Sequence, residues 1–230
     1  MRSDDISIGT FDAPARAATG TVVIIDVFRA FTTAAVALGN GAEKIVMVDD
    51  LDQARRLRAE GIGSRCLGER HGVAPDGFDY GNSPHEIRDI RFDGETLIQT
   101  TTNGTRGIHA AANAQRVYAG AFVTAKATAQ AIAAGPAGPV SLIAMGDGGH
   151  RRTDEDEICA LYLRARLCGR QPNREALQSL ILSQADLKDT RDLSPEDVSA
   201  CLAADTVPFA IRVEPENGMW IARMEQPAQG

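Results

Sequence analysis

Short apolar segments rich in Val and Ile alternate along the chain with longer segments in which apolar residues recur at helical spacing. This alternation is typical of parallel strands that are covered by crossover helices. The apolar segments predict strands over 21–26, 44–48, 65–68, 96–100, 116–119 and 140–145. The other segments predict helices over 29–38, 50–60, 105–114, 123–134, 153–167, 173–183 and 194–203. We therefore expect an α/β fold with helices on both faces of a mostly parallel sheet, in a layered α/β/α arrangement.

The C-terminal part of the chain has a different pattern. Two short apolar runs, 209–213 and 219–224, are joined through Pro215-Glu216-Asn217-Gly218. An Asn-Gly pair between two apolar runs is a strong signal for a tight hairpin turn. The pattern predicts a C-terminal β-hairpin.

The 230 residues are enough for one domain. The nearest thing to a linker is the Gly, Pro and Ala stretch over 134–139. We expect residues 1–230 to form a single domain, with 134–139 as the candidate boundary if that domain divides into two similar lobes.

The charge balance excludes several classes of partner. Lys and Arg number 24 against 31 Asp and Glu, which gives a net charge of −7. Such a chain has no general attraction for nucleic acid or for an anionic membrane. No apolar run approaches the roughly 20 residues of a membrane-spanning helix, and the N-terminus lacks the pattern of a secretory signal. We expect a cytoplasmic protein that binds anions only locally.

The first candidate for chemistry is Asp26, at the end of the first apolar run. Ligands of open α/β sheets bind beyond the carboxyl ends of the strands. An Asp at this point is well placed to hold a metal ion or to attack a phosphorus atom. The alternative is a helix cap or an ion-pair partner for Arg29.

A glycine-rich excursion follows the third predicted strand. It contains Gly68-Glu69-Arg70-His71-Gly72 and, further on, 77–84, and long loops of this kind are often functional. Ser83 fits a helix N-cap with Glu86 three residues later as a capping box, which would leave amide groups for an anion beside Asn82. Capping alone accounts for Ser83 and Glu86, but not for Glu69 and Arg70 between glycines.

The run Thr100-Thr101-Thr102-Asn103-Gly104-Thr105-Arg106 lies between a predicted strand and a predicted helix. Its hydroxyl groups, side-chain amide and backbone N–H groups at a helix start are typical of a phosphate cradle. Arg106 would add a bidentate charge. The alternative is a polar turn with Thr105 as N-cap, but a turn does not require three consecutive threonines.

A fourth segment combines a glycine-rich loop, 146–149, with four consecutive acids, 154–157, at the start of a predicted helix. Acids in a first turn complement the helix dipole. Carboxylates also supply oxygens to a hard cation, and magnesium is the usual one where phosphate is bound. The two interpretations are compatible, and they make Glu155 and Asp156 candidate metal ligands.

Together, four segments resemble the 2-phosphosulfolactate phosphatase family over about residues 20–168. They are Asp26-Val27-Phe28-Arg29-Ala30-Phe31-Thr32-Thr33, the glycine-rich excursion, 100–106, and Glu155-Asp156 with Cys159-Ala160. The resemblance implies a magnesium-dependent phosphatase that releases sulfolactate and inorganic phosphate from 2-phosphosulfolactate or a closely similar phosphorylated hydroxy acid. It also implies a homodimer.

These observations give each candidate residue an expected role. We expect Asp26, Arg29, Glu69 and Arg70 to be catalytic, and Asp26, Glu155 and Asp156 to bind Mg²⁺. We expect the small anionic phosphorylated substrate to contact Asn82, Ser83, Thr101, Thr102, Asn103, Gly104, Thr105 and Arg106. Strand-end geometry is expected to gather Arg29, Arg70 and Arg106 around one pocket. The competing hypothesis is a non-catalytic regulatory module that binds phosphate or another anion.

Overall fold

The computed structural model describes residues 1–183 and 193–227. The strands are β1 (Ile6–Thr10), β2 (Thr21–Ile25), β3 (Lys44–Val48), β4 (Arg65–Gly68), β5 (Thr96–Thr100), β6 (Arg116–Gly120), β7 (Val140–Ala144), β8 (Ala210–Glu216) and β9 (Met219–Glu225). The helices are α1 (Asp12–Ala17), α2 (Ala30–Gly39), α3 (Leu51–Ala59), α4 (Pro84–Ile87), α5 (Gly104–Ala110), α6 (Ala125–Ala134), α7 (Asp154–Leu167), α8 (Arg174–Ser183) and α9 (Pro195–Leu202), with two short 3-10 helices, η1 (Ser3–Asp5) and η2 (Phe122–Thr124).

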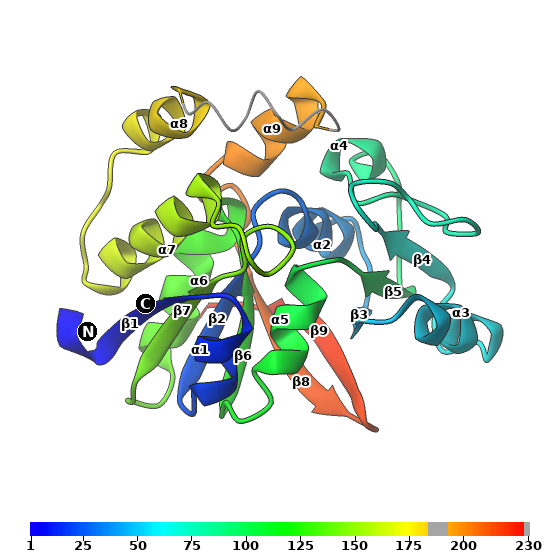
Figure 1. Ribbon diagram of the computed structural model, residues 1–230, viewed down its shortest axis with the longest axis horizontal. Helices are drawn as coiled ribbons and strands as arrows, with labels where there is room; N and C mark the ends of the chain where they lie inside the picture. Colours follow the sequence, from blue (N-terminus) through cyan, green and yellow to red (C-terminus); the bar gives the residue numbers. More distant parts are fainter. Residues whose placement is uncertain (184–192, 228–230) are drawn as a thin grey trace.

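The strands form one sheet in the order β1-β7-β2-β6-β8-β9-β3-β5-β4 (Figure 1). The first four strands in this order are parallel to one another, and so are the last three. The predicted α/β class and the mostly parallel sheet are confirmed. The edge strand β1 and helix α1 were not expected, because residues 1–20 carry no long apolar run. The candidate lobe boundary, 134–139, falls in the connection between α6 and β7.

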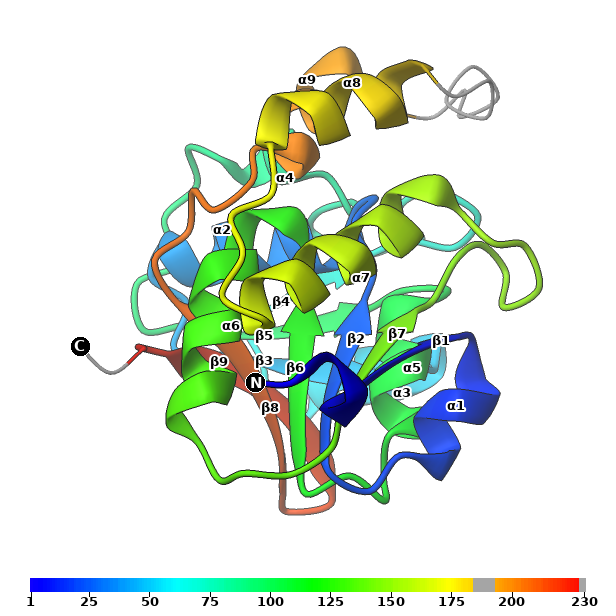
Figure 2. The same ribbon diagram turned by 90° about the vertical axis from the view of Figure 1, so that its left-hand side faces the viewer.

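Alternate residues of the strands are buried on opposite faces of the sheet. In β2, Val22 and Ile24 belong to the core beneath α1, α2 and α5, whereas Val23 and Ile25 belong to the core beneath α6 and α7. A third core lies beneath α3, around Ala54. Figure 2 shows α8 and α9 beyond α7, at one end of the molecule. The three layers that the strand pattern predicts are therefore present, since both faces of the sheet are covered.

The C-terminal hairpin has the predicted turn. Glu216 pairs with Met219, so Asn217 and Gly218 form a two-residue loop. Both loop residues have positive φ, 51° and 77°, as a type I′ turn requires. The hairpin lies in the middle of the sheet, because β8 is antiparallel to β6 and β9 is antiparallel to β3. It therefore joins the two parallel groups.

Three successive antiparallel pairs separate the two parallel groups. In a flat sheet, these pairs would place the carboxyl ends of β2 and β5 at opposite edges. Neighbouring strands twist by about 20–25°, and five pairings lie between β2 and β5. The accumulated twist turns β4 and β5 across the direction of β2 (Figure 1). Gly104, which follows β5, consequently lies against Asp26, which follows β2.

Two helix starts follow the sequence expectations. Ser83 caps α4 and Ser194 caps α9, each by accepting a hydrogen bond from a backbone N–H three residues later. Pro84 and Pro195 occupy the first helical position, where the missing N–H costs nothing.

Among the described residues, every helix is too short or too polar to cross a bilayer.

Candidate active site

Asp26 lies between the end of β2 and the start of α2, and it is only 6% exposed. Its Oδ1 accepts a hydrogen bond from the Ala30 backbone N–H at 3.3 Å. Gly104 packs on the other side. A Cβ atom at Gly104 would lie 2.9 Å from Asp26 Oδ2 and 3.0 Å from the ring of Phe31, so this close approach requires glycine. The structure therefore brings Asp26 and Gly104 together.

Glu69 joins the glycine-rich excursion to the turn that follows β5. Its Oε1 accepts from the Thr102 backbone N–H at 2.7 Å, and its Oε2 accepts from the Thr102 hydroxyl at 3.1 Å and from the Gly72 N–H at 2.9 Å. Glu69 is 8% exposed. Three hydrogen bonds thus hold this carboxylate in place between two loops.

The threonine run forms a tight turn. The Thr101 N–H donates to the Thr105 hydroxyl at 3.0 Å, and the Thr105 N–H donates to the Thr101 hydroxyl at 3.1 Å. Helix α5 begins at Gly104, so Asn103 is the N-cap residue and Thr105 is not. Within the described part of the chain, the buried Oδ1 of Asn103 has no hydrogen-bond partner. Thr101 therefore bonds within the turn, whereas Thr102 bonds to Glu69.

The four acids at the start of α7 face different surroundings. Asp156 is buried, and its two oxygens accept from the backbone N–H groups of Val27, at 2.8 Å, and Gly146, at 2.9 Å. It therefore fastens the end of β2 to the end of β7. Glu157 pairs with Arg152 at 2.7 Å and accepts from the Thr10 hydroxyl at 2.9 Å. Asp154 is exposed and Glu155 is half-buried.

Asp26, Glu69, Glu155 and Asp156 form what we call the carboxylate cluster. Burial, followed by the charge of Glu69, raises the pKa of Asp26 to about 7 from the usual 3.8. Burial and the charges of Glu155 and Asp26 raise the pKa of Asp156 well above its usual value, and burial raises the pKa of Glu155. In the residues that the structure describes, no three His, Cys, Asp or Glu side chains are already arranged to hold a metal ion. The donors are hard oxygens of the kind that Mg²⁺ prefers, close enough to repel one another but not preassembled.

The three arginines that were expected around one pocket bind different partners. Arg29 donates from Nη1 to Asp197 Oδ2 at 3.0 Å and from Nη2 to the Gly72 carbonyl at 3.2 Å. Arg106 forms an ion pair with Asp12 of α1, with Nη2 2.8 Å from Oδ2. Of these two arginines, Arg29 is thus the one that reaches the loop held by Glu69.

Arg70 turns toward the ends of β3 and β5. Its Nη2 donates to the Thr100 hydroxyl at 2.7 Å and to the Asp49 carbonyl at 2.9 Å, and its Nη1 donates to the carbonyl of Glu69 at 2.7 Å. Burial lowers the pKa of this guanidinium. Arg70 therefore ties together strand ends rather than presenting all its donors to a ligand.

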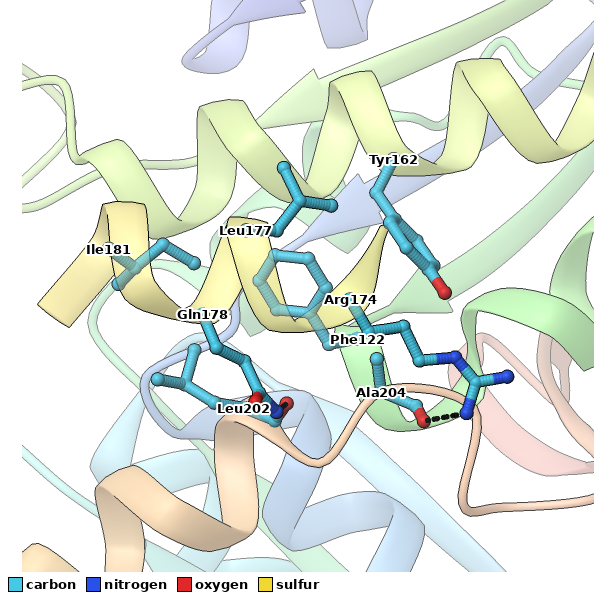
Figure 3. A pocket seen from close by; sticks show the side chains of 8 residues that line it. All are labelled: Phe122, Tyr162, Arg174, Leu177, Gln178, Ile181, Leu202 and Ala204. Atoms are coloured by element: carbon cyan, nitrogen blue, oxygen red, sulfur yellow. Dashed lines mark hydrogen bonds between the residues drawn. The ribbon is translucent and has the colours of Figure 1, made fainter. Parts of the chain in front are cut away.

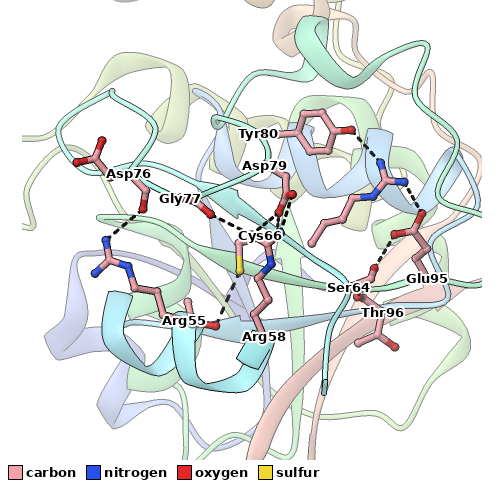
Figure 4. A network of polar contacts seen from close by, with 12 residues as sticks. Arg55, Arg58, Ser64, Cys66, Asp76, Gly77, Asp79, Tyr80, Glu95 and Thr96 are labelled. Carbon is pink, nitrogen blue, oxygen red and sulfur yellow. Dashed lines mark hydrogen bonds and ion pairs between the residues drawn. The ribbon is translucent and has the colours of Figure 1, made fainter. Parts of the chain in front are cut away.

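Helix α3 pins the glycine-rich excursion (Figure 4). Arg58 donates to the Gly77 carbonyl at 2.9 Å and to Asp79 Oδ1 at 3.0 Å, while Asp79 Oδ2 accepts from the Cys66 N–H at 2.8 Å. Arg55 adds one bond to the Asp76 carbonyl at 3.3 Å. The excursion is therefore an ordered loop whose tip is fastened to α3.

The far end of this excursion brings Asn82 and Ser83 to α4. Asn82 is 5% exposed, and its Oδ1 has no partner within residues 1–183 and 193–227. The Ser83 hydroxyl accepts from the Glu86 N–H at 3.1 Å, whereas the Glu86 carboxylate accepts from the Gly81 N–H at 3.0 Å. The expected capping box is therefore half formed, since Glu86 bonds to Gly81 instead of to the N-cap residue.

Sequence reasoning missed Asp197 of α9, which is 2% exposed. It accepts from Arg29, from the Ser83 hydroxyl at 2.7 Å and from the His85 N–H at 3.0 Å. One signal was available: Asp197 precedes buried Cys201 by four residues, so it lies on the inward face of its helix. A carboxylate on such a face requires a partner.

Comparisons with known proteins match the chain to one family. The family model described as 2-phosphosulpholactate phosphatase matches residues 10–209. A protein of Caldicellulosiruptor saccharolyticus named "Probable 2-phosphosulfolactate phosphatase" is 41% identical over 110 residues, 48% of this chain and 46% of that protein. A protein of the same name from Prochlorococcus marinus is 35% identical over 164 residues, 70% of this chain and 67% of that protein. The match to the first of these relatives spans about half of its length.

Proposed function

Because the chain belongs to the 2-phosphosulpholactate phosphatase family, we propose that it is a phosphomonoester hydrolase. Its proposed substrate is 2-phosphosulfolactate or a closely similar phosphorylated hydroxy acid, which it cleaves to the hydroxy acid and inorganic phosphate. The names of its relatives support this reaction. The observation that carries the proposal is the buried carboxylate cluster at the strand ends, with Asp26 beside Glu69 and within the electrostatic influence of Glu155.

We propose Mg²⁺ as the cofactor, held by Asp26, Glu155 and Asp156. Burial raises the pKa of each, and a divalent cation would favour the ionised forms. Asp156 already accepts two backbone N–H groups, so it would contribute through its remaining lone pairs. When bound, Mg²⁺ polarises the phosphoryl group and neutralises charge on its oxygens.

The chain's own residues would orient the substrate and stabilise its charge. Asp26 is fixed by the Ala30 N–H, and it faces the reacting phosphorus either as a nucleophile or as a metal ligand. Arg29 offers guanidinium donors to the phosphoryl oxygens. Asn82 and Asn103 keep buried amide oxygens that have no partner within the described residues, so these acceptors are available to water. Glu69 fixes the two loops that border this space through Thr102 and Gly72.

The test is phosphate release by the purified protein. We expect turnover of 2-phosphosulfolactate in the presence of Mg²⁺, loss of that turnover in EDTA, and recovery when Mg²⁺ is restored. 2-Phosphoglycerate and 2-phospholactate, assayed in parallel, report whether the second acidic group must be a sulfonate. Tight binding of inorganic phosphate without turnover of any of these esters would contradict the proposal and support a non-catalytic anion-binding module.

A further inference from the structure

The carboxylate of Asp197 connects helix α9 to two other parts of the chain. Its Oδ2 accepts from Arg29, which precedes α2, at 3.0 Å. Its Oδ1 accepts from the Ser83 hydroxyl at 2.7 Å and from the His85 N–H at 3.0 Å, both at the start of α4. One side chain of α9 thus sets the position of Arg29 relative to the glycine-rich excursion.

Arg29 and Asp197 form a buried ion pair. The side chain of Arg29 is 10% exposed and that of Asp197 is 3% exposed. A buried charge that loses its partner is strongly unfavourable, and replacement of one member forces the other to move or to find a new partner. The orientation of the Arg29 guanidinium therefore depends on Asp197.

The Arg29 guanidinium is held in place, but not all of its N–H donors have partners within the described residues. A guanidinium has five N–H donors. Within the described chain, Arg29 has two hydrogen-bond partners, Asp197 and the Gly72 carbonyl. The Nε–H and one N–H on each terminal nitrogen are left for a ligand. These donors keep a fixed direction only while Asp197 and Gly72 hold the other side of the group.

Helix α9 is capped at its first turn and bonded to α8 at its last. Asp197 projects from its first turn, where its own N–H is capped by the Ser194 hydroxyl at 3.1 Å. The other end of α9 lines a pocket together with residues of α8 and η2 (Figure 3). There Gln178 donates to the Leu202 carbonyl at 2.6 Å, and Leu202 lies beside Phe122. The Asp197 carboxylate thus projects from the capped first turn of a helix whose last turn is bonded to α8.

We propose that Asp197 is a positioning residue that aims Arg29 at the anionic substrate. The proposal rests on the proposed function, because it assigns Arg29 to a substrate anion. Asp197 does not touch the substrate. It acts through Arg29, and a guanidinium that is already oriented binds an anion without first losing its own freedom of movement. Loss of Asp197 should therefore weaken anion binding more than it slows the chemical step.

The experiment is a double-mutant cycle in the full-length protein with Mg²⁺. We expect Asp197→Asn to raise KM for 2-phosphosulfolactate about tenfold while kcat changes less than about threefold. The combined Arg29→Gln and Asp197→Asn variant should have the KM of Arg29→Gln alone, because Asp197 acts only through Arg29. Calorimetry should show the same pattern in the Kd for inorganic phosphate. If Asp197→Asn does not fold, Asp197→Glu replaces it, with an expected KM between wild type and Arg29→Gln.

Asp205→Asn is the matched control. Asp205 is another buried carboxylate, which accepts from the Tyr162 hydroxyl at 2.7 Å and from the Lys126 N–H at 2.8 Å, and it plays no part in the proposed site. This variant should lose stability and keep its KM.

An unchanged KM and Kd in Asp197→Asn, or additive effects of the two substitutions, would overturn the proposal while wild-type turnover leaves the proposed function intact. Wild-type protein that binds phosphate with the expected coupling but hydrolyses no ester would overturn the proposed function alone. Wild-type protein that neither turns over nor binds phosphate would overturn both.

Discussion

At the scale of single residues, the carboxylate cluster makes stability depend on pH. Burial and neighbouring charges raise the pKa of Asp26 to about 7, above the 3.8 of an unperturbed Asp. The folded state therefore binds this proton more tightly than the unfolded state does. The free energy of unfolding of the metal-free protein should consequently fall as the pH rises from about 4 through 7, and stay low above pH 7.

Urea unfolding in EDTA, repeated across this pH range, measures the effect. Asp26→Asn removes the titrating group, so its curve should be flatter between pH 4 and 7 than that of the wild type. Added Mg²⁺ should stabilise the wild type more at pH 8 than at pH 5. Parallel curves for wild type and variant would show that Asp26 titrates normally.

Asp156 should matter for folding as well as for the metal. It accepts from two backbone N–H groups, those of Val27 and Gly146, and Asp156→Ala leaves both without this acceptor. A buried N–H without an acceptor costs about 1–3 kcal/mol, so we expect the loss of both acceptors to lower the free energy of unfolding by about 2–6 kcal/mol at pH 6. Glu155→Ala, in the same turn of α7, is the control and should lose less than half of this amount. Equal losses of unfolding free energy in the two variants, measured by chemical denaturation, would contradict a stabilising role for the two backbone hydrogen bonds of Asp156.

At the scale of elements, helix α3 should control the order of the glycine-rich excursion. Arg58→Met keeps the length of the side chain but removes its bonds to Gly77 and Asp79. Amide hydrogen exchange over residues 77–82 should become at least about tenfold faster, because local opening loses both contacts. Arg55→Met removes only one, longer contact to the excursion, together with a surface ion pair to Asp52 within α3, and should have a smaller effect. Unchanged exchange in Arg58→Met would mean that other contacts hold the loop.

Helix starts and strand ends could be read from the sequence, because their causes are local. Ser83 and Ser194 each accept a hydrogen bond from a backbone N–H three residues later, so the capping signal lies within four residues. Asp26 directly follows its strand. The partners of the threonine run could not be read in this way. Thr102 bonds to Glu69, 33 positions away. No pattern of residue types specifies which loop will approach from that distance.

At the scale of the whole molecule, the sequence predicted the layers of the fold but not which strands lie next to one another in the sheet. The alternation of apolar runs with helical segments predicted the layers, and the Asn217-Gly218 pair predicted the hairpin. The hairpin's place between β6 and β3 depends on contacts between segments roughly 90–180 residues apart, so local signals are silent about it. Asp197 was missed for the same reason, since its partner Arg29 lies 168 positions earlier.

Kinetic comparison of Asp26→Asn with the wild type is the most direct test of the central claim, that the carboxylate cluster around Asp26 hydrolyses a phosphomonoester. The quantity measured is kcat/KM for phosphate release from 2-phosphosulfolactate with Mg²⁺. We predict a loss of at least about 1000-fold in a folded Asp26→Asn protein. Asp89→Asn, at an acid whose side chain is 83% exposed, should match the wild type. A folded Asp26→Asn variant within about tenfold of wild-type kcat/KM would contradict the account.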